Sequence, residues 1–402
     1  MLDAYLYDGV RTPFGRHAGC LSGVRPDELL GETIRGLMAR NAFSPEEVED
    51  VIAGCTCQAG EDSRNIGRQG GLLAGLPIEA GGQTVNRLCG SGLAAILDAA
   101  RAATCGEGEL FVAGGVESMS RAPFVLGKAE KPFSRSAELY DSTMGARFPN
   151  MRLAAQFGSD TMPATADNVA SALDIRRAES DRFAEASQAK YQAAKQASFY
   201  ADEIMAIPVP GKSRDQALPV QVSEDEHPRP GTTYEKLAAL RPLFDGGVVT
   251  AGTASGINDG AAALLVGTLA AGKRCGAQPR GRLLAGAIAG VEPRLMGLGP
   301  VPSSRKALER AGLSLAQMDV IEINEAFAAQ VLGCLRQMQL SADDTRLNPN
   351  GGAIAIGHPL GASGARLALT ALRQLERAGG RYALVTMCIG VGQGIAAVIE
   401  RI

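Results

Sequence analysis

The chain has 402 residues and a formal net charge of -3. Hydrophobic residues make up 46% and charged residues 21% of it, which is typical of a globular protein and excludes both a basic nucleic-acid-binding chain and a disordered one. At this length two or three lobes are expected.

Strand-like and helical patterns alternate along the N-terminal part of the chain. They predict a strand at 5–10, a helix at 27–41, a strand at 49–55, a helix at 89–105 and a strand at 109–119. This alternation is typical of the α/β class and predicts a mostly parallel sheet covered by helices.

Residues 121–254 differ in composition from the two repeated ends of the chain. They are charged, contain prolines and are rich in residues typical of loops. One helical stretch is predicted there, over 165–199. We interpret the segment as an insertion.

The sequence contains an internal repeat. SGLAAILDAAR (91–101) followed by ELFVAGG (109–115) resembles SGARLALTALR (363–373) followed by RYALVTM (381–387) at a constant offset. The two ends of the chain therefore look like copies of one lobe. Duplicated α/β lobes commonly form a site where loops at the strand ends of both copies meet.

Two of the eight cysteines stand at strand ends. Cys89 follows a strand-like run and precedes a helix, and Cys388 opens a loop with glycines at three alternate positions. Such a loop lets backbone N–H groups point at a ligand, although a cysteine after a strand is also a common core residue. Cys55 and Cys57 form a lone C-x-C without a second Cys or His pair nearby, so we expect core thiols and no metal site.

Scattered cysteines and the absence of a signal peptide predict a reducing, cytoplasmic location. No apolar stretch reaches the roughly 18 residues of a membrane helix, and no membrane or nucleic-acid partner is expected.

Only three histidines are present. His17 and His227 lie in charged runs and are predicted to be solvated loop residues. His358 differs, because it lies in the glycine-rich stretch 348–366 just before a helix. A neutral imidazole at such a junction is a candidate general base. Asn324 ends an apolar run, where an asparagine serves as a turn or cap residue or faces a site.

Together these blocks resemble one family, the thiolases. The resemblance is carried by VRTPFG, NRLCGSG, GGVESMS, TAGTASGINDGAAA, MGLGP, NEAF, NPNGGAIAIGHPLGASGAR and CIGVGQG. It implies two βαβαβαββ halves in a layered α/β/α/β/α core, and usually a homotetramer built as a dimer of dimers. The N-terminal half would comprise 1–120 and 255–279, the inserted loop domain 121–254, and the C-terminal half 280–402.

The resemblance also implies catalytic roles. Cys89 would be the nucleophile that is acylated, His358 the base that activates it, and Cys388 the proton donor or acceptor at the acetyl carbon. Asn324 would hold a water that binds the thioester oxygen together with His358. The N–H groups of Cys89 and Gly390 would form a second oxyanion hole. A helix N-terminus and a nearby imidazole predict a lowered pKa for Cys89.

No permanently bound cofactor is implied, and coenzyme A enters as a substrate. By resemblance, Ser255 would contact its pantetheine, while Met162 and Phe327 would line the channel. Lys212 or Arg214 in GKSRD would lie near the nucleotide phosphates, or GKSRD would be a solvated loop.

The substrate branch is indicated by QAGEDSRN (58–65), YDSTMGARFPN (140–150) and DEHPRPGTT (225–233). These segments look like the branch that cleaves 3-oxoadipyl-CoA to succinyl-CoA and acetyl-CoA in aromatic-acid degradation. An arginine would bind the distal carboxylate bidentately. Arg64 and Arg147 are the candidates, unless they are surface or tetramer residues.

Two positions depart from the family pattern. Thr253 stands where the block usually has an asparagine, which leaves the hydrogen bonding of that loop open. Ala146 stands where the 3-oxoadipyl-CoA branch commonly has a tryptophan.

Alternative functions remain open at this stage. An acetoacetyl-CoA thiolase would share the whole catalytic set. A decarboxylating condensing enzyme typically pairs two histidines with one cysteine, and the single well-placed His358 argues against it. A non-catalytic protein that binds acyl-CoA or lipid should have lost part of the set, and Cys89, His358 and Cys388 are all present.

Overall fold

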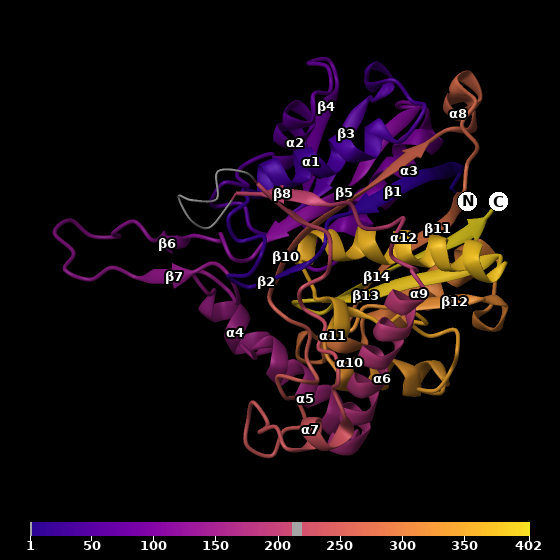
Figure 1. Cartoon of the computed structure of the whole chain (residues 1–402). Helices are drawn as coiled ribbons and strands as arrows, with labels where there is room; N and C mark the ends of the chain where they lie inside the picture. The colour runs from indigo at the N-terminus through magenta and orange to yellow at the C-terminus, as the bar shows by residue number, and fades with distance from the viewer. Residues whose placement is uncertain (1, 211–218) are drawn as a thin grey trace.

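The computed structural model describes residues 2–210 and 219–402. Within these residues, ten strands form one mixed sheet in the order β12-β13-β14-β11-β1-β10-β5-β3-β4, with β2 paired to β10 (Figure 1). Both termini lie beside β11, because the N–H of Leu2 bonds Leu284 and that of Ile402 bonds Arg280.

The elements fall into three consecutive groups. The first group comprises β1 (Ala4–Arg11), β2 (Gly15–Arg16), α1 (Pro26–Ala39), β3 (Asp50–Gly54), α2 (Ile66–Ala74), β4 (Gly81–Val85), α3 (Ser91–Cys105) and β5 (Leu110–Ser118). The second comprises β6 (Phe124–Leu126), β7 (Leu139–Asp141), α4 (Met151–Phe157), α5 (Met162–Ala172), α6 (Arg177–Gln196), β8 (Ile207–Val209), β9 (Val220–Val222) and α7 (Tyr234–Ala238). The third comprises β10 (Asn258–Gly267), α8 (Leu269–Cys275), β11 (Gly281–Gly290), α9 (Pro300–Ala311), β12 (Val320–Ile323), α10 (Ala328–Met338), α11 (Ala353–Ile356), α12 (Leu360–Ala378), β13 (Tyr382–Ile389) and β14 (Gln393–Arg401).

The expectation of a mostly parallel sheet is wrong. Strand β3 pairs in parallel with β4 and β5, and β12 pairs in parallel with β13. All pairs among β1, β10, β11 and their neighbours β5 and β14 are antiparallel, as is β13 with β14. Each half therefore adds antiparallel strands to a parallel core. The alternation of strand and helix patterns could not reveal them, because antiparallel partners need only a short turn or a distant segment.

Helices α3 and α12, which carry the internal repeat, pack on each other and on strands of both halves. Figure 1 shows α12 between the strands of the two halves. Both helices are buried around most of their circumference, as a central layer requires. They approach closely at two glycines. A Cβ on Gly92 would lie 2.5 Å from the carbonyl oxygen of Gly361, and one on Gly364 would overlap the backbone of Leu93. Glycine here lets the two N-termini meet.

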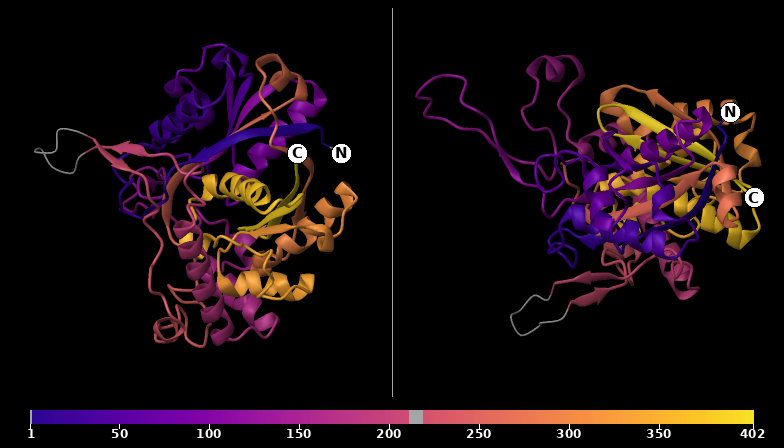
Figure 2. Two further views of the ribbon diagram at one scale, coloured as in Figure 1. Left: turned by 45° about the vertical axis from the view of Figure 1, so that its right-hand side comes forward. Right: turned by 90° about the horizontal axis from the view of Figure 1, so that it is seen from above.

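The segment between β5 and β10 leaves the sheet. The β6–β7 hairpin projects from the body (Figure 1 and the right-hand view of Figure 2). The single helical stretch expected over 165–199 is two helices, α5 and α6. They are separated near Asp174, which has a left-handed φ of 51°, a conformation that ends an α-helix.

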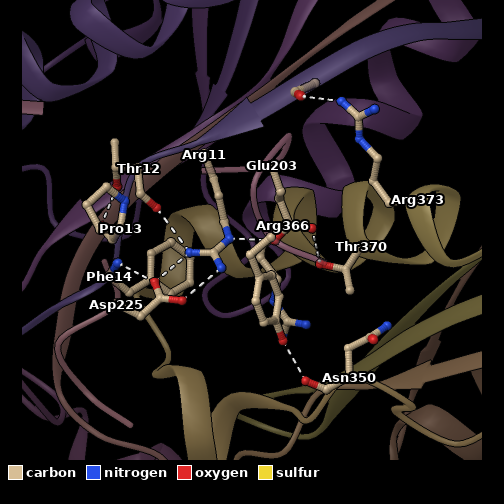
Figure 3. A network of polar contacts seen from close by, with 12 residues as sticks. Arg11, Thr12, Pro13, Phe14, Glu203, Asp225, Asn350, Arg366, Thr370 and Arg373 are labelled. Carbon is tan, nitrogen blue, oxygen red and sulfur yellow. Dashed lines mark hydrogen bonds and ion pairs between the residues drawn. The ribbon is translucent and has the colours of Figure 1, made fainter. Parts of the chain in front are cut away.

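A buried ionic cluster fixes this segment to both halves. Figure 3 shows Arg11 of β1 between Glu203 and Asp225. Its guanidinium donates to both Asp225 oxygens, at 2.6 and 2.9 Å. Thr370 of α12 donates to Glu203 at 3.0 Å. Arg11, Glu203 and Thr370 are fully buried, so every charge in the cluster depends on its partners.

Among the described residues, no helix combines the length and the apolar character needed to cross a membrane.

Candidate active site

Cys89 lies in a tight turn between β4 and α3. Leu88 adopts a left-handed φ of 47°, and its N–H donates to Asn86 Oδ1 at 3.0 Å. The hydroxyl of Ser91 accepts the Arg87 N–H at 2.9 Å and donates to the Leu88 carbonyl at 2.6 Å. These bonds hold the turn closed, so the thiol is presented at the start of α3. The Cys89 side chain is half-buried.

His358 precedes α12 as Cys89 precedes α3, and its ring orientation is fixed from one side. Nδ1 lies 2.6 Å from Ser363 Oγ, and that hydroxyl donates its own hydrogen to the Pro359 carbonyl at 2.9 Å. Ser363 must therefore accept from Nδ1–H, which leaves Nε2 without a proton. The Asn324 amide nitrogen faces Nε2 at 3.4 Å. The site thus holds a neutral imidazole whose unprotonated Nε2 faces the Asn324 amide.

Ser363 was missed by sequence reasoning. The available signal was its place in the first turn of the helix that follows His358.

A second missed residue, Asn258 at the start of β10, holds the backbone of His358. Asn258 Oδ1 accepts the His358 N–H at 2.9 Å, and its amide donates to the Gly15 carbonyl at 2.9 Å. Gly357 has a φ of 109°, and a Cβ there would lie 2.6 Å from Asn258 Cγ. The close approach explains the glycine before His358.

Asn324 follows β12 and is fully buried. Its N–H bonds the Thr386 carbonyl at 3.0 Å. Its side-chain oxygen has no hydrogen-bond partner among the described residues, so it does not act as a cap or turn residue. A buried amide oxygen without a protein partner suits a water or a ligand group.

Cys388 and Gly390 reach the same place from the end of β13. The backbone N–H groups of Gly390 and Cys89 both act on the Cys89 thiol. A Cβ on Gly390 would lie 3.3 Å from Leu88 Cδ1 and 3.4 Å from Met162 Sδ. Cys388 is 1% exposed. The two thiols interact electrostatically, so the structure brings the loops of both halves together.

The protonation states differ from the expectation for Cys89. Burial raises the pKa of its thiol to about 11, and the two backbone N–H groups only partly oppose that effect. The prediction of a lowered pKa is wrong, because desolvation outweighs the helix N-terminus and His358 carries no charge. Burial and the charge of Arg366 lower the pKa of His358 to about 3. Burial, and secondarily Cys89, raises the pKa of Cys388. At neutral pH the site holds two thiols and a neutral imidazole.

Three of the residues expected to contact coenzyme A lie beside this centre. Met162 and Phe327 belong to the same apolar cluster as Cys388. The Ser255 N–H bonds the Ala326 carbonyl at 3.0 Å, which places it against the segment that follows Asn324. Lys212 and Arg214 lie outside the described residues.

The two arginines proposed for a distal carboxylate lie on neighbouring loops. Arg64 is exposed and Arg147 is half-buried. Arg147 acts electrostatically on Asp62, two positions before Arg64. Within the described part of the chain, neither side chain forms a salt bridge.

The unusual Thr253 keeps its loop hydrogen-bonded. Its hydroxyl accepts the Thr250 N–H at 2.8 Å, and its carbonyl accepts the Ala328 N–H at 2.8 Å.

His227 is not the solvated loop residue that was predicted, because it is 8% exposed. Its imidazole packs so closely on Gly256 that a Cβ there would overlap it. Burial, and secondarily Arg229, lowers the pKa of His227 to about 4. The charged run around His227 was expected to be exposed to solvent. Instead, Asp225 accepts a hydrogen bond from the buried Arg11, and this bond holds the segment against the protein.

The expected exposure of three other residues is confirmed. His17 is exposed, and Cys55 and Cys57 are buried. Near these two cysteines, Glu117 accepts the N–H groups of Cys57 at 3.0 Å and Gly361 at 2.9 Å. Burial raises the pKa of Glu117 to about 7. It connects the loop after β3 to the N-terminus of α12.

Comparisons with known proteins agree with this geometry. The family models "Thiolase, N-terminal domain" and "Thiolase, C-terminal domain" match residues 4–269 and 277–401. A beta-ketoadipyl-CoA thiolase of Escherichia coli is 56% identical and one of Acinetobacter baylyi is 54% identical, each over 100% of both chains.

Solved structures show the same fold. The acetyl-CoA acetyltransferase of Bacillus anthracis has a TM-score of 0.92 at 36% identity, and human mitochondrial 3-ketoacyl-CoA thiolase has 0.92 at 38%. Each alignment covers 100% of this chain and 99% of the other. The chain therefore has the thiolase fold that the resemblance implied, and it belongs to the thiolase family.

Proposed function

We propose that the protein cleaves 3-oxoadipyl-CoA with coenzyme A to give succinyl-CoA and acetyl-CoA, a step in aromatic compound degradation. The observation that supports the chemistry is that the Cys89 and Cys388 thiols interact electrostatically, while His358, before the equivalent helix of the second lobe, has an unprotonated Nε2. The choice of substrate is supported by the full-length identity to beta-ketoadipyl-CoA thiolases.

The first half-reaction starts from neutral groups. Nε2 of His358 takes the proton of Cys89 as the sulfur attacks the ketone carbon at position 3. The N–H groups of Cys89 and Gly390 stabilise the resulting oxyanion, a contribution on the order of 3 kcal/mol for each such donor. When the intermediate collapses, the bond between carbons 2 and 3 breaks and its electrons pass into the thioester enolate. His358 and a water held by Asn324 would bind that enolate oxygen.

Protonation completes the cleavage. The Cys388 thiol gives its proton to carbon 2, and acetyl-CoA leaves with the succinyl group on Cys89. In the second half-reaction the Cys388 thiolate takes the proton of the incoming coenzyme A, whose sulfur attacks the succinyl thioester. Cys89 departs and recovers its proton from the His358 imidazolium. Protons and electrons balance over the cycle, so no bound cofactor or metal takes part.

The segment 121–254 is proposed to bind coenzyme A through Met162, with Ser255 and Phe327 from the adjoining loops, and Lys212 or Arg214 at the nucleotide phosphates. The halves comprise 1–120 with 255–279, and 280–402.

We also assign this segment the tetramer contacts of a dimer of dimers. The β6–β7 hairpin and the stretch after it expose many apolar side chains, which a second copy would cover. These are Phe124, Leu126, Phe133, Leu139, Met144, Phe148, Met151 and Leu153. All eight cysteines are free thiols, which supports a cytoplasmic location.

The function is tested by assaying CoA-dependent cleavage of 3-oxoadipyl-CoA and acetoacetyl-CoA side by side. We expect kcat/KM to be at least about tenfold higher for 3-oxoadipyl-CoA, a preference of roughly 1.4 kcal/mol. A higher value for acetoacetyl-CoA would assign the alternative acetyl-CoA acetyltransferase activity. No cleavage of either compound would contradict both and leave only acyl-CoA binding.

Arg64→Ala and Arg147→Ala test the carboxylate contact. Loss of a charge-assisted bidentate hydrogen bond costs about 1.5–3 kcal/mol, so kcat/KM for 3-oxoadipyl-CoA should fall roughly 10- to 100-fold. Acetoacetyl-CoA has no distal carboxylate and should change less than about twofold. The matched control is Arg101→Ala, an exposed arginine on α3, which should leave both substrates unaffected. An equal loss on both substrates would remove the arginine from carboxylate binding.

A further inference from the structure

Glu117, near the end of β5, is a buried carboxylate that faces backbone donors from two parts of the chain. Its side chain is 1% exposed and forms no salt bridge within the described residues. One oxygen accepts the Cys57 N–H at 3.0 Å. The other accepts the N–H groups of Thr56 at 3.1 Å and of Gly361 at 2.9 Å. An ionised carboxylate is an acceptor only, so it suits a place where each of these backbone contacts is a donor.

The contact with Gly361 caps α12 from a distant strand. Gly361 lies in the first turn of α12, where backbone N–H groups have no partner within the helix. The N-cap residue, Pro359, supplies no side-chain hydrogen bond, and a carboxylate also interacts favourably with the dipole at a helix N-terminus. The helix starts directly on the sheet, because a Cβ on Gly361 would lie 2.3 Å from the Val116 carbonyl oxygen. Glu117 therefore fixes the start of the helix that follows His358.

The contact with Thr56 leads to the Cys89 turn. Thr56 follows β3, and its carbonyl accepts the Asn86 amide at 3.3 Å. Asn86 Oδ1 in turn accepts the N–H of Leu88, the residue before Cys89, at 3.0 Å. With one carboxylate, Glu117 thus holds both the start of α12 and the loop that supports this turn.

We propose that Glu117 is a positioning residue for thiolysis: its carboxylate sets the placement of His358 relative to Cys89 by holding the segments next to each of them. The inference rests on the proposed function, in which the Cys89 proton passes to Nε2 of His358. A displacement of about 1 Å between reacting groups can lower the rate about 100-fold.

The variant Glu117→Gln removes this function with little change of shape. Glutamine has nearly the volume of glutamate, but its amide nitrogen is a donor. Whichever carboxylate oxygen the nitrogen replaces, at least one of the three backbone N–H groups would face another donor.

A purely structural role of Glu117 leads to different expectations. Loss of the cap would then lower the free energy of unfolding, but the molecules that remain folded would keep the native kcat and the native environment of His358. Loss of a positioning contact changes both properties in the folded protein. Circular dichroism establishes that the variant is folded before either property is measured.

The first readout needs no turnover and uses NMR of the full chain with 13Cε1-labelled histidine. The measurements are made at pH 8, above the pKa of about 7 to which burial raises Glu117, so that the native carboxyl group is about 90% ionised. Only three histidines are present, and the variant His358→Gln identifies the His358 signal by its loss. In Glu117→Gln the His358 signal should shift, while the signal of the exposed His17 should stay in place.

The second readout is thiolysis of 3-oxoadipyl-CoA by the folded variant at the same pH. We expect kcat to fall at least about tenfold and KM to change less than about twofold, because the residues proposed to bind coenzyme A are left in place. The matched control is Glu107→Gln. Glu107 is an exposed glutamate just beyond the C-terminal end of α3, and its replacement should leave both readouts unchanged.

A folded Glu117→Gln protein with the native His358 signal would overturn the inference, and so would one with the native kcat. If Glu117→Gln does not fold, Glu117→Asp is measured instead, because its shorter side chain keeps the charge but cannot reach both the loop and the helix. The same two outcomes then decide. Because the NMR measurement needs no turnover, it separates failure of this inference from failure of the proposed reaction.

Discussion

Replacing Cys89 by alanine is expected to lower kcat for thiolysis by about 10⁴-fold or more, the range found when a covalent nucleophile is removed. The reason is that Cys89 is the thiol on which the backbone N–H groups of Cys89 and Gly390 act. Cys388 lies close but is buried near the end of β13. The measurement is CoA-dependent cleavage of 3-oxoadipyl-CoA, with circular dichroism to establish folding.

The matched control lies on the same helix. Cys105 is an exposed thiol at the C-terminal end of α3, and Cys105→Ala should retain full activity. In the native protein, incubation with 3-oxoadipyl-CoA without coenzyme A should place a succinyl group on the peptide that contains Cys89. A succinyl group on another cysteine, or activity in Cys89→Ala, would remove Cys89 from the nucleophilic role.

His358→Gln is expected to lower kcat by about 10²- to 10⁴-fold, the usual contribution of a positioned general base. Glutamine fills part of the same volume but its amide cannot take a proton at neutral pH. Because the pKa of His358 is lowered to about 3, the native enzyme should show no acidic limb from this group between pH 5 and 8. Measuring kcat/KM against pH for the native enzyme checks that part.

A variant with near-native kcat at pH 8 would contradict the role of His358 as the base. A native profile whose acidic limb has a midpoint near 6.5, the ordinary value for histidine, would instead contradict its lowered pKa. His17→Gln serves as the control, because His17 is exposed.

Much of the fold was predictable because the sequence contains an internal repeat, so that each half of the chain supports the interpretation of the other. The repeat identified α3 and α12 as equivalent helices, and the residues two positions before them, Cys89 and His358, became candidates. Gly92 and Gly364 then explain why those N-termini meet. The strand directions were not predictable, because β10 and β14 pair by antiparallel contacts that leave no trace in the periodicity of a single segment.

The candidate site was predictable in its composition but not in its electrostatics. A helix N-terminus suggested an acidic thiol at Cys89, but burial dominates there and raises its pKa. Ser363 and Asn258 hold the ring and backbone of His358 through contacts across the fold. The buried state of His227 depends on a salt bridge of its neighbour Asp225 with residue 11. Each of these depends on which residues meet in three dimensions.

The cluster around Arg11 constrains the order in which the chain can fold during synthesis. Arg11 is in the first strand, yet its carboxylate partners are residues 203 and 225. Its strand neighbour β10 begins only at residue 258. An N-terminal lobe that emerges alone therefore lacks both an edge partner and the counter-charges for a cation it must bury. Pairing between residues so far apart in the sequence is slow. The N-terminal lobe should therefore remain incompletely folded, and accessible to chaperones, until more than half of the chain has been synthesised.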